Sequence, residues 1–408
     1  MPKLIPFTLL IFTLAGSAAG AAPLKWADVR SMALDKNPAL RGANQREQSS
    51  RAELKGSYGN FLPDLGVNAS RFQRNEVING GAQVVEPRDS AGFNANLNLF
   101  AGGATLAEVK RARANLMSTR ADRDLTSADL RQRLRQAFFE VSFQQDRIGL
   151  YERIVTRLQQ NERIIQLKYD TGAEARWNVQ KTTADVRRAE QNLLSARNGL
   201  KIARDQLAAL LYLDSLPEGS VEPLKIEDAA FDLGSPDDLS KVHPTVRKAE
   251  AQAEVADRYR TTARSALLPA LDLTYYDYRE RERAGNLFRK RETRWAVNAT
   301  WNIFNGLTDY YKLQQANLNF EAADLQRLDD SRRVLTEVRT GATNFETARA
   351  ALPVARSQRE AAEERVKTVR TQYRTGLKTY IDWEQSESQL IEAEEAEVTA
   401  IRTALFAL

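Results

Sequence analysis

Two stretches of the sequence share one pattern: LKYDTGAEARWNVQ, residues 167–180, and VRTQYRTGLKTYIDWEQ, residues 369–385. In each, a tyrosine stands three residues before a glycine, and the two glycines, Gly172 and Gly376, lie 204 residues apart. Long charged stretches with a helical pattern flank both glycines. Because glycine is the usual residue just past the end of a helix, we expect two helix–turn–helix tips.

The motifs around the two tips recur in the same order. Two of the three spacings between them are identical in both halves, at 25 and 72 residues, and the third is 37 residues in one half and 35 in the other. Spacings kept to the residue over such lengths predict one duplicated unit. The matched motifs are Asn37-Pro38 with His243-Pro244, Leu62-Pro63 with Leu268-Pro269, Asn98-Leu99-Phe100 with Asn302-Ile303-Phe304, and Tyr169 with Tyr373.

Each half also contains two segments in which apolar and polar residues alternate. In FNANLNL, residues 93–99, every odd position is apolar and every even position is asparagine. Residues 65–70, 271–276 and 295–303 alternate in the same way. A period of two predicts strands with one apolar face. Runs of about 10 residues also match the length of a tilted strand that crosses an outer membrane.

Two folds accommodate such strands. In a soluble β-sandwich the apolar faces would form a core, whereas in a membrane barrel they would face lipid around a wet lumen. The asparagine-rich opposite face, together with Trp295 and Trp301 near the two ends of one segment, favours the barrel. The sandwich stays open as the alternative at this point.

Long helical patterns with a seven-residue period surround both tips. A strict seven-residue period predicts left-handed supercoiling, and alanines in the second seam allow a close approach of neighbouring helices. The roughly 68 residues before Gly172 would form a rod of about 100 Å. Gln144 and Glu397 are polar exceptions in the pattern, and we expect Pro353 to kink its helix. The seam residues include Leu134, Val141, Ile148 and Val155 before the first tip, and Val186, Ala189, Leu193, Ala196 and Ala203 after it.

The N-terminus has the pattern of an export signal. Lys3 precedes the apolar run LIPFTLLIFTLAG, and small residues lead to a cleavage site at Ala19-Gly20-Ala21. We therefore predict a signal peptide at residues 1–21, with an uncleaved membrane anchor as the alternative. No other apolar run approaches the about 20 residues that a spanning helix needs.

The composition excludes several classes of function. The chain has no cysteine and a single histidine, His243, which excludes disulfides, thiol catalysis, histidine-based metal sites and catalytic triads. Its +5 charge is spread along helical stretches with interspersed acids, a pattern typical of solvated faces. With an export signal, this disfavours nucleic acid as a partner. We expect no enzyme activity, no metal and no cofactor, and because no phosphate-binding glycine-rich loop follows a strand, energy must come from a partner.

Four strands in one chain do not close a barrel. Single-chain outer-membrane barrels begin at about 8 strands, and an open sheet edge is not tolerated in lipid. Several chains must therefore share one barrel, and cyclic symmetry is the simplest arrangement. Two chains would give a barrel filled by side chains, whereas three would leave a lumen. Long helices beneath the strands favour three.

These paired motifs resemble the TolC-type outer-membrane efflux family (outer membrane factors) over essentially the whole mature chain. The resemblance implies an α+β membrane protein in which a trimer shares a 12-stranded β-barrel, four strands per chain. A long α-helical coiled-coil barrel would continue it, with a small mixed equatorial region.

The resemblance also implies a place in the cell and a function. The chain would lie in the outer membrane, contact its lipid and extend into the periplasm. It would be the passive exit duct of a tripartite efflux or type I secretion system, with a periplasmic adaptor (membrane fusion) protein and an inner-membrane transporter as partners. A soluble periplasmic coiled-coil scaffold or pump adaptor is the alternative, and a periplasmic hydrolase is disfavoured by the composition.

The family's gate implies roles for residues at the two tips. Tyr373 and Lys378 match the aromatic and basic residues that latch the closed state, and their partner positions are Trp177 and Asn178. Because the family has an acid where this chain has Asn178, we expect only a neutral hydrogen bond there, which is weaker than one to a carboxylate. Trp177 is expected to be a packing residue.

The implied pore constriction follows the second tip. Asp382 matches its first acid, Gln385 stands in place of the second, and Glu384 is adjacent. Three Asp382 side chains around an axis would favour cations and raise one another's pKa. The alternative is an ordinary first-turn acid that interacts with a helix N-terminus. For the membrane interface, the implied aromatics are Trp295, Trp301, Phe100 and Phe304.

The predicted organisation follows from these segments. The signal peptide precedes a first repeat at residues 22–212, an equatorial linker at 213–241 that is rich in proline, aspartate and glycine, and a second repeat at 242–408. The predicted strands are residues 62–74, 90–100, 268–282 and 291–304, and the predicted long helices are residues 103–170, 173–211, 307–374 and 377–406.

Overall fold

The computed structural model describes residues 23–78, 82–217, 219, 221–222, 235–282 and 288–407. The predicted signal peptide and part of the predicted linker lie outside these residues. The chain divides into two compact units. We call them the tip unit, which comprises Met1–Asn37, Leu130–Ala230 and Thr343–Leu408, and the sheet unit, which comprises Pro38–Asp129 and Phe231–Ala342.

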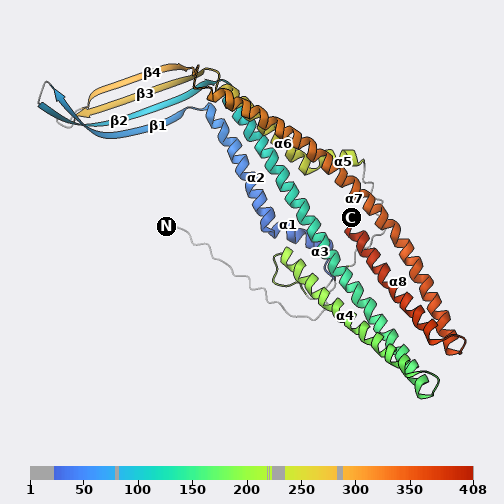
Figure 1. Cartoon of the computed structure of the whole chain (residues 1–408). Coiled ribbons are helices and arrows are strands. Elements are labelled where there is room, and N and C mark those ends of the chain that lie inside the picture. The colour runs from blue at the N-terminus through green and yellow to red at the C-terminus, as the bar shows by residue number, and fades with distance from the viewer. Residues whose placement is uncertain are drawn as a thin grey trace, which may run out of the picture. The chain divides into compact units, whose positions relative to one another are not determined.

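The sheet unit contains one four-stranded antiparallel sheet in the order β1-β2-β3-β4 (Figure 1). The first repeat supplies one hairpin and the second repeat supplies the other, and β2 pairs with β3 between them. Within the described residues β1 and β4 are therefore the two edges. The strands are β1, Asp64–Ile78; β2, Ala82–Ala101; β3, Ala270–Glu282; and β4, Phe288–Thr300.

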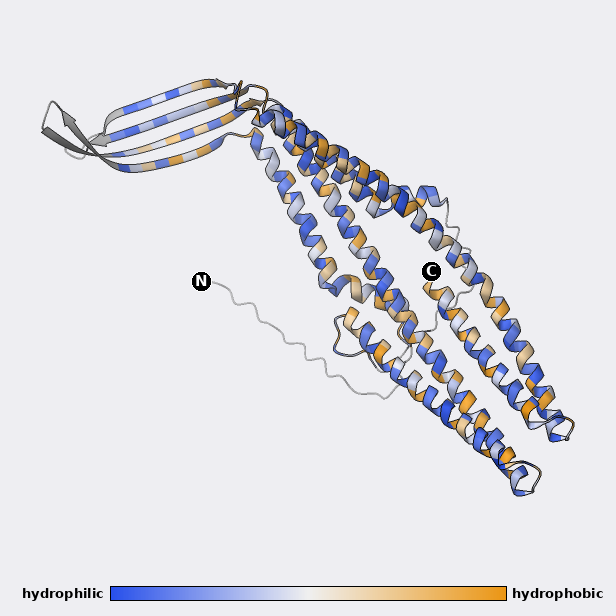
Figure 2. Cartoon of the chain, in the orientation of Figure 1, coloured by the Kyte–Doolittle hydropathy of each residue, from blue (hydrophilic) through white to orange (hydrophobic). Residues whose placement is uncertain are grey.

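The strand register separates an apolar from a polar face. Leu65 pairs with Ala95, Ala95 with Tyr275, and Tyr275 with Trp295, so one row of these side chains crosses the sheet. Figure 2 shows the alternation of hydrophilic and hydrophobic residues along the strands. On this face Val67 is 85% exposed, which shows that the apolar side of the sheet is uncovered in the single chain.

Hydrogen bonds between side chains link neighbouring strands on the polar face. The hydroxyls of Ser70 and Ser90 lie 2.7 Å apart. Asn98 Nδ2 donates to Asp272 Oδ1 at 3.1 Å, and Asn298 Nδ2 donates to Thr274 Oγ1 at 3.3 Å. Each of these bonds satisfies polar groups without involving the apolar face. The predicted strands with one apolar and one asparagine-rich face are thus confirmed.

Four helical segments of the sheet unit precede or follow the strands. Proline begins α2 and α6 at the two matched positions, Pro38 and Pro244, where a missing N–H is tolerated. His243 caps α6, because its Nδ1 accepts a hydrogen bond from the Thr245 amide at 3.3 Å. These segments are α2, Pro38–Ser57; the 3-10 helix η1, Tyr58–Phe61; α5, Pro236–Val242; and α6, Pro244–Ser265.

A buried carboxylate joins α2 to the first part of α3. Glu47 is 6% exposed and contacts three arginines, with distances of 2.9 Å to Arg51, 3.2 Å to Arg120 and 2.6 Å to Arg123. Burial alone would raise the pKa of Glu47, but the hydrogen bonds from Arg120 and Arg51 outweigh it and lower the pKa. Glu47 is therefore an ionic link between the two helices.

The tip unit is helical. It contains two helix pairs, one from each repeat, and the long helices α3 and α7 contribute residues to both units. No helix in the described part of the chain combines the length and apolar character needed to cross a membrane. The helices are α1, Trp26–Lys36; α3, Ala104–Asp170; α4, Arg176–Leu210; α7, Thr308–Arg374; and α8, Tyr380–Phe406.

The core of the tip unit follows the seven-residue pattern. Leu150, Tyr151 and Ile154 of α3 are buried against Ala189 and Ala196 of α4. From α8, Ile391 and Val398 pack against the same cluster. The small alanines of the second seam are thus buried where helices meet. The hydrophobic effect of this shared seam holds α3, α4 and α8 together.

The structure explains two of the polar exceptions in the pattern. Gln144 is buried opposite Gly199, where a Cβ atom would lie only 2.8 Å from Gln144 Oε1. Glu397 lies 2.6 Å from Arg359 Nε and so has an ionic partner on the neighbouring helix α7. Helix α7 continues through Pro353 without a break, and a kink there stays a prediction.

Candidate gate at the helix tips

The two tips have the same backbone turn. Gly172 and Gly376 adopt positive φ angles of 77° and 81°, which favour glycine. In the first tip the Ala173 amide donates to the Lys168 carbonyl at 2.8 Å, and in the second Leu377 donates to Gln372 at 2.8 Å. This pattern is a Schellman motif, which satisfies the last carbonyl groups of a helix.

The tyrosines at matched positions of the two tips have different surroundings. Tyr169 is 38% exposed, whereas Tyr373 is 2% exposed. Tyr373 belongs to a buried cluster with Ile165, Tyr380 and Trp383. The tyrosine of the second tip therefore packs between the two helix pairs, and the tyrosine of the first does not.

Tyr373 has a carboxylate partner in the first tip. Its hydroxyl donates a short hydrogen bond to Glu174 Oε1. Asn178 donates from Nδ2 to the other oxygen of the same carboxylate. The expectation of a neutral bond to Asn178 was therefore wrong, because Glu174 supplies the acid and Asn178 orients it.

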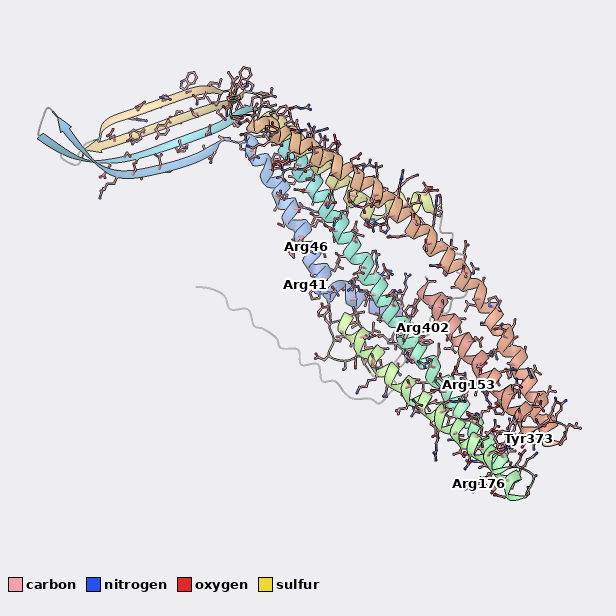
Figure 3. The ribbon with its side chains drawn as sticks, viewed as in Figure 1. Arg41, Arg46, Arg153, Arg176, Tyr373 and Arg402 are labelled. Carbon is pink, nitrogen blue, oxygen red and sulfur yellow. The ribbon has the colours of Figure 1, made fainter. Side chains whose placement is uncertain are left out.

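The aromatic ring of Tyr373 is held from both sides. Lys168 Nζ lies 3.9 Å from the ring centroid and also donates to the Tyr373 carbonyl at 3.2 Å. The ring stacks on Trp383 with centroids 4.8 Å apart. Burial, followed by the hydrogen bond to Glu174, raises the pKa of Tyr373 well above its usual range. The phenol thus keeps its proton and stays a donor. Figure 3 shows the side chains as sticks and labels Tyr373 near the end of α7.

The other residues matched to the latch make different contacts. Trp177 packs edge-on against Tyr380, with ring centroids 5.7 Å apart. Lys378 Nζ lies 3.7 Å from Asp382 Oδ1, on the same tip. Among the residues matched to the latch by sequence, Tyr373 and Asn178 meet through Glu174, whereas Lys378 makes its ion pair within the second tip.

Asp382 forms a capping box with Thr379 at the start of α8. The Thr379 amide donates to Asp382 Oδ2 at 3.0 Å, and the Asp382 amide donates to Thr379 Oγ1 at 3.2 Å. The backbone hydrogen bond from Thr379 is the main cause that lowers the pKa of Asp382. In the single chain this geometry matches the first-turn alternative, and the acidic ring of a trimer stays a prediction.

Glu384 and Gln385, the other proposed constriction residues, differ in their contacts. Glu384 Oε1 lies 3.1 Å from Lys181 Nζ, so its charge is paired across α4 and α8. Gln385 is exposed. Asp382 and Gln385 are therefore the more accessible of the three proposed constriction side chains.

Sequence reasoning missed Glu174 and Lys168. Both lie within the quoted LKYDTGAEARWNVQ stretch, on either side of the turn glycine. A carboxylate two residues beyond Gly172 was the available signal, and it stands 204 residues before Lys378, but the family pattern pointed instead to Trp177 and Asn178. Both residues contact Tyr373 across the two tips.

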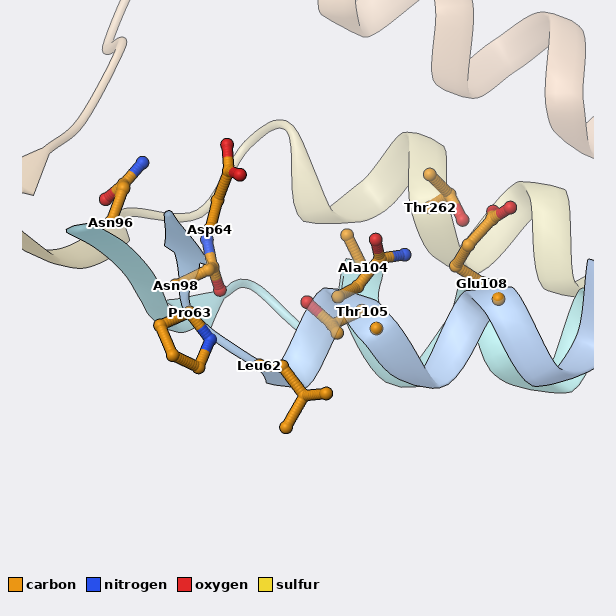
Figure 4. A pocket seen from close by; sticks show the side chains of 12 residues that line it. Leu62, Pro63, Asp64, Asn96, Asn98, Ala104, Thr105, Glu108 and Thr262 are labelled. Carbon is orange, nitrogen blue, oxygen red and sulfur yellow. The ribbon is translucent and has the colours of Figure 1, made fainter. Parts of the chain in front are cut away.

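The sheet unit contains an open pocket of about 840 Å³ (Figure 4). Asp64, Asn96 and Asn98 reach it from the polar face of the sheet. Glu108 also lines it and is ion-paired with Arg111 at 2.5 Å. The pocket therefore continues the polar surface of the strands.

Comparison with known proteins assigns the chain to a family. The family model described as "Outer membrane efflux protein" matches residues 29–211 and 236–407. This chain belongs to the outer membrane efflux protein family. The family's members are outer-membrane efflux proteins.

Two curated relatives illustrate the range of the family. The alkaline protease secretion protein AprF of Pseudomonas aeruginosa is 27% identical over 206 residues, which are 49% of this chain and 41% of AprF. The cation efflux system protein CusC of Escherichia coli is 22% identical over 251 residues, which are 60% of this chain and 53% of CusC. The aligned segments thus span about half the length of these relatives.

Solved structures share the fold over nearly the whole chain. The outer-membrane channel OprN has a TM-score of 0.86 at 19% identity, covering 93% of this chain and 87% of OprN. The outer membrane protein VceC of Vibrio cholerae has a TM-score of 0.84 at 18% identity, covering 94% of each chain. The predicted fold class is thereby confirmed.

Proposed function

We propose that this protein is the outer-membrane exit duct of a tripartite efflux or type I secretion system. It conducts substrates passively from an inner-membrane transporter to the exterior and is gated at the helix tips. The relative AprF, a secretion protein, supports the secretion system, and the relative CusC, a cation efflux protein, supports the efflux system. The duct carries out no catalysis, and the transporter supplies the energy.

The observation that carries the proposal is the open four-stranded sheet. Within the described residues β1 and β4 each pair on one side only, and their apolar face is exposed. Long unpaired edges invite pairing with another chain, and lipid does not tolerate them unpaired. Three copies joined edge to edge would form a closed 12-stranded barrel with a lumen. The asparagine-rich face would line that lumen.

Exposed aromatics support a membrane setting for the sheet. Trp295 lies in β4 and is 74% exposed, and Phe100 near the end of β2 is 45% exposed. Trp301 and Phe304 follow the end of β4 at Thr300, and both are more than half exposed. Aromatic residues concentrate at the membrane–water interface. We assign these four side chains to the inner, helix-proximal border of the lipid and the region just above it.

The tips support the gating part of the proposal. Gly172 and Gly376 turn the chain at the two hairpin ends, and Tyr373, Glu174 and Lys168 bond these ends across the two repeats. A movement of the second hairpin away from the first must break these bonds. We propose this set as the latch, with Asp382 and Gln385 at the constriction.

Two protein partners complete the proposed system. The tips are the periplasmic end of the duct, so they would meet the periplasmic adaptor, and the adaptor would connect them to the inner-membrane transporter. Leu377 is 77% exposed and Leu167 is 66% exposed, which leaves apolar side chains at both tips available for such a contact. A protein interface with a few buried apolar anchors fits this arrangement.

The proposal is tested by reconstituting the purified mature protein in a planar lipid bilayer. Light scattering in detergent should give the mass of a trimer. The wild-type protein should show a small conductance, and Glu174→Gln should increase it because the latch loses its charged acceptor. Tyr169→Phe, at the matched exposed tyrosine, should leave the conductance unchanged.

Other results would contradict the proposal in different ways. A water-soluble monomer without conductance would remove the duct and favour a periplasmic scaffold or adaptor. A conducting trimer in which Glu174→Gln and Tyr169→Phe have the same conductance would support the duct. It would contradict the assignment of the latch to these residues.

A further inference from the structure

A small cavity in the tip unit lies where three helices meet. Its volume is about 30 Å³, and α3, α4 and α8 all contribute to its walls. Leu158 and Ile391 give it apolar sides. The other wall residues carry polar groups: Asn161, Thr182, Asp185, Arg188, Tyr380, Trp383, Glu384, Glu387 and Ser388.

Three polar atoms of the wall lack a hydrogen-bond partner in the described structure. They are Asn161 Oδ1, the Tyr380 hydroxyl and Glu387 Oε2. Their residues are 4%, 6% and 4% exposed, so bulk water does not satisfy these atoms. Buried polar groups are nearly always hydrogen-bonded to protein or to ordered water. Three such atoms around one cavity therefore indicate a shared ligand.

The charges around the cavity are balanced. Glu387 Oε1 accepts a bond from Trp383 Nε1 at 3.3 Å, and Glu387 Oε2 lies 3.1 Å from Arg157 Nε without the alignment of a hydrogen bond. Lys181 lies within 3.1 Å of both Asp185 and Glu384, the other acids of the wall. With each acid paired, a neutral ligand fits better than a cation.

We propose that this cavity is a hydration site in which one or two water molecules join α3 to α8. A buried water needs about 10–15 Å³ and two to four polar partners, and the cavity provides both. The water donates to Asn161 Oδ1 and Glu387 Oε2 and accepts from the Tyr380 hydroxyl. Asn161 belongs to the first repeat, whereas Tyr380 and Glu387 belong to the second. The site is thus a water-mediated link between the two helix pairs.

The substitution Tyr380→Phe tests the site by the sign of its effect. It removes only the hydroxyl and keeps the ring that packs against Trp177. If water bonds the hydroxyl, the variant in detergent should lose about 2 °C in its thermal unfolding midpoint. If the hydroxyl is unpaired, its removal relieves a buried unsatisfied group, and the midpoint stays equal or rises. The second result would overturn the proposal.

A double-mutant cycle adds a second test of the bridge. Tyr380→Phe and Asn161→Ala are measured alone and together, and Tyr169→Phe with Asn161→Ala is the control cycle. If Tyr380 and Asn161 share a bridging water, their shifts should be non-additive, whereas the control cycle should be additive. Additive shifts would contradict the bridge. These measurements require folded protein but no conduction, so they do not depend on the proposed duct.

A crystal structure at high resolution identifies the ligand. Crystals grown with rubidium chloride should show water density within hydrogen-bond distance of Asn161, Tyr380 and Glu387, without an anomalous peak. A rubidium peak in the cavity would show that the ligand is a monovalent cation, which would contradict the water site. A cavity without density would also contradict it.

Discussion

The Tyr373 hydroxyl donates a hydrogen bond to Glu174, and this bond joins the last turn of the second repeat's long helix to the first repeat's tip. The two residues lie 199 positions apart in the chain. Tyr169, the duplicate of Tyr373, is 38% exposed. A duplicated motif has thus become asymmetric, with one copy buried in a contact and the other on the surface.

The first prediction concerns the strength of this contact. Tyr373→Phe keeps the ring on Trp383 and removes the donor to Glu174. Because hydrogen bonds to charged groups contribute about 1.5–3 kcal/mol, we expect the free energy of unfolding to fall by an amount near the lower value. We also expect the conductance to rise. Thermal dissociation of the trimer and bilayer recordings measure the two effects. The matched variant Tyr169→Phe should change neither, and an equal effect of both variants would contradict the assignment.

The second prediction concerns alkaline pH. Burial and the bond to Glu174 raise the pKa of Tyr373 in the folded protein above the ordinary value of 10.0. The stability from this group is fully present below about pH 10 and is lost as the pH rises beyond it, because the unfolded chain then releases the proton more readily. Melting curves between pH 8 and about pH 11 should fall more steeply for the wild type than for Tyr373→Phe. Parallel curves would show that Tyr373 is not perturbed.

Local periodicity explains why much of the fold could be predicted. Alternation in residues 93–99 fixes which side chains share a sheet face, and the seven-residue seam fixes which side of α4 is buried. The fourth strand was predicted to run to residue 304 but ends at Thr300, and the first two were predicted too short at their far ends, since β1 extends to Ile78 and β2 begins at Ala82. Charged residues such as Arg71 and Asp89 break the alternation there, although they pair across the strands at 2.6 Å.

The contacts of the proposed latch could be predicted only in part. Tyr373 was found by its motif, but its partner depends on how the turn at Gly172 directs Glu174 toward the second helix pair. A repeat offset assumes that both copies have equivalent surroundings. The burial of Tyr373 and the exposure of Tyr169 show that they do not. The contacts between the two repeats therefore cannot be predicted from the pattern of one repeat alone.

The third prediction concerns His243, the only histidine. Its Nδ1 accepts the Thr245 amide at the start of α6, and burial lowers its pKa below 6.5 despite the nearby Glu337. A lowered pKa gives stability that is present above about pH 6.5 and lost as the pH falls through the folded value. We expect the melting midpoint at pH 5 to drop by about 1–2 °C relative to His243→Asn. That variant carries the residue of the matched position Asn37 and retains a capping side chain. An identical pH dependence in both proteins would contradict this prediction.

The fourth prediction separates the two roles of Asp382. In the chain the carboxylate caps α8 through Thr379, and its lowered pKa keeps it charged until the pH falls below the ordinary aspartate range. In a trimer three such charges would form an acidic ring that favours cations. We expect Asp382→Asn to abolish cation selectivity in bilayer recordings, and Thr379→Ala, which removes the capping hydroxyl but keeps the charge, to retain it. If both variants keep selectivity and both weaken the trimer, Asp382 is a helix cap alone and the constriction lies elsewhere. If Thr379→Ala loses selectivity as well, the cap is what holds the carboxylate toward the axis.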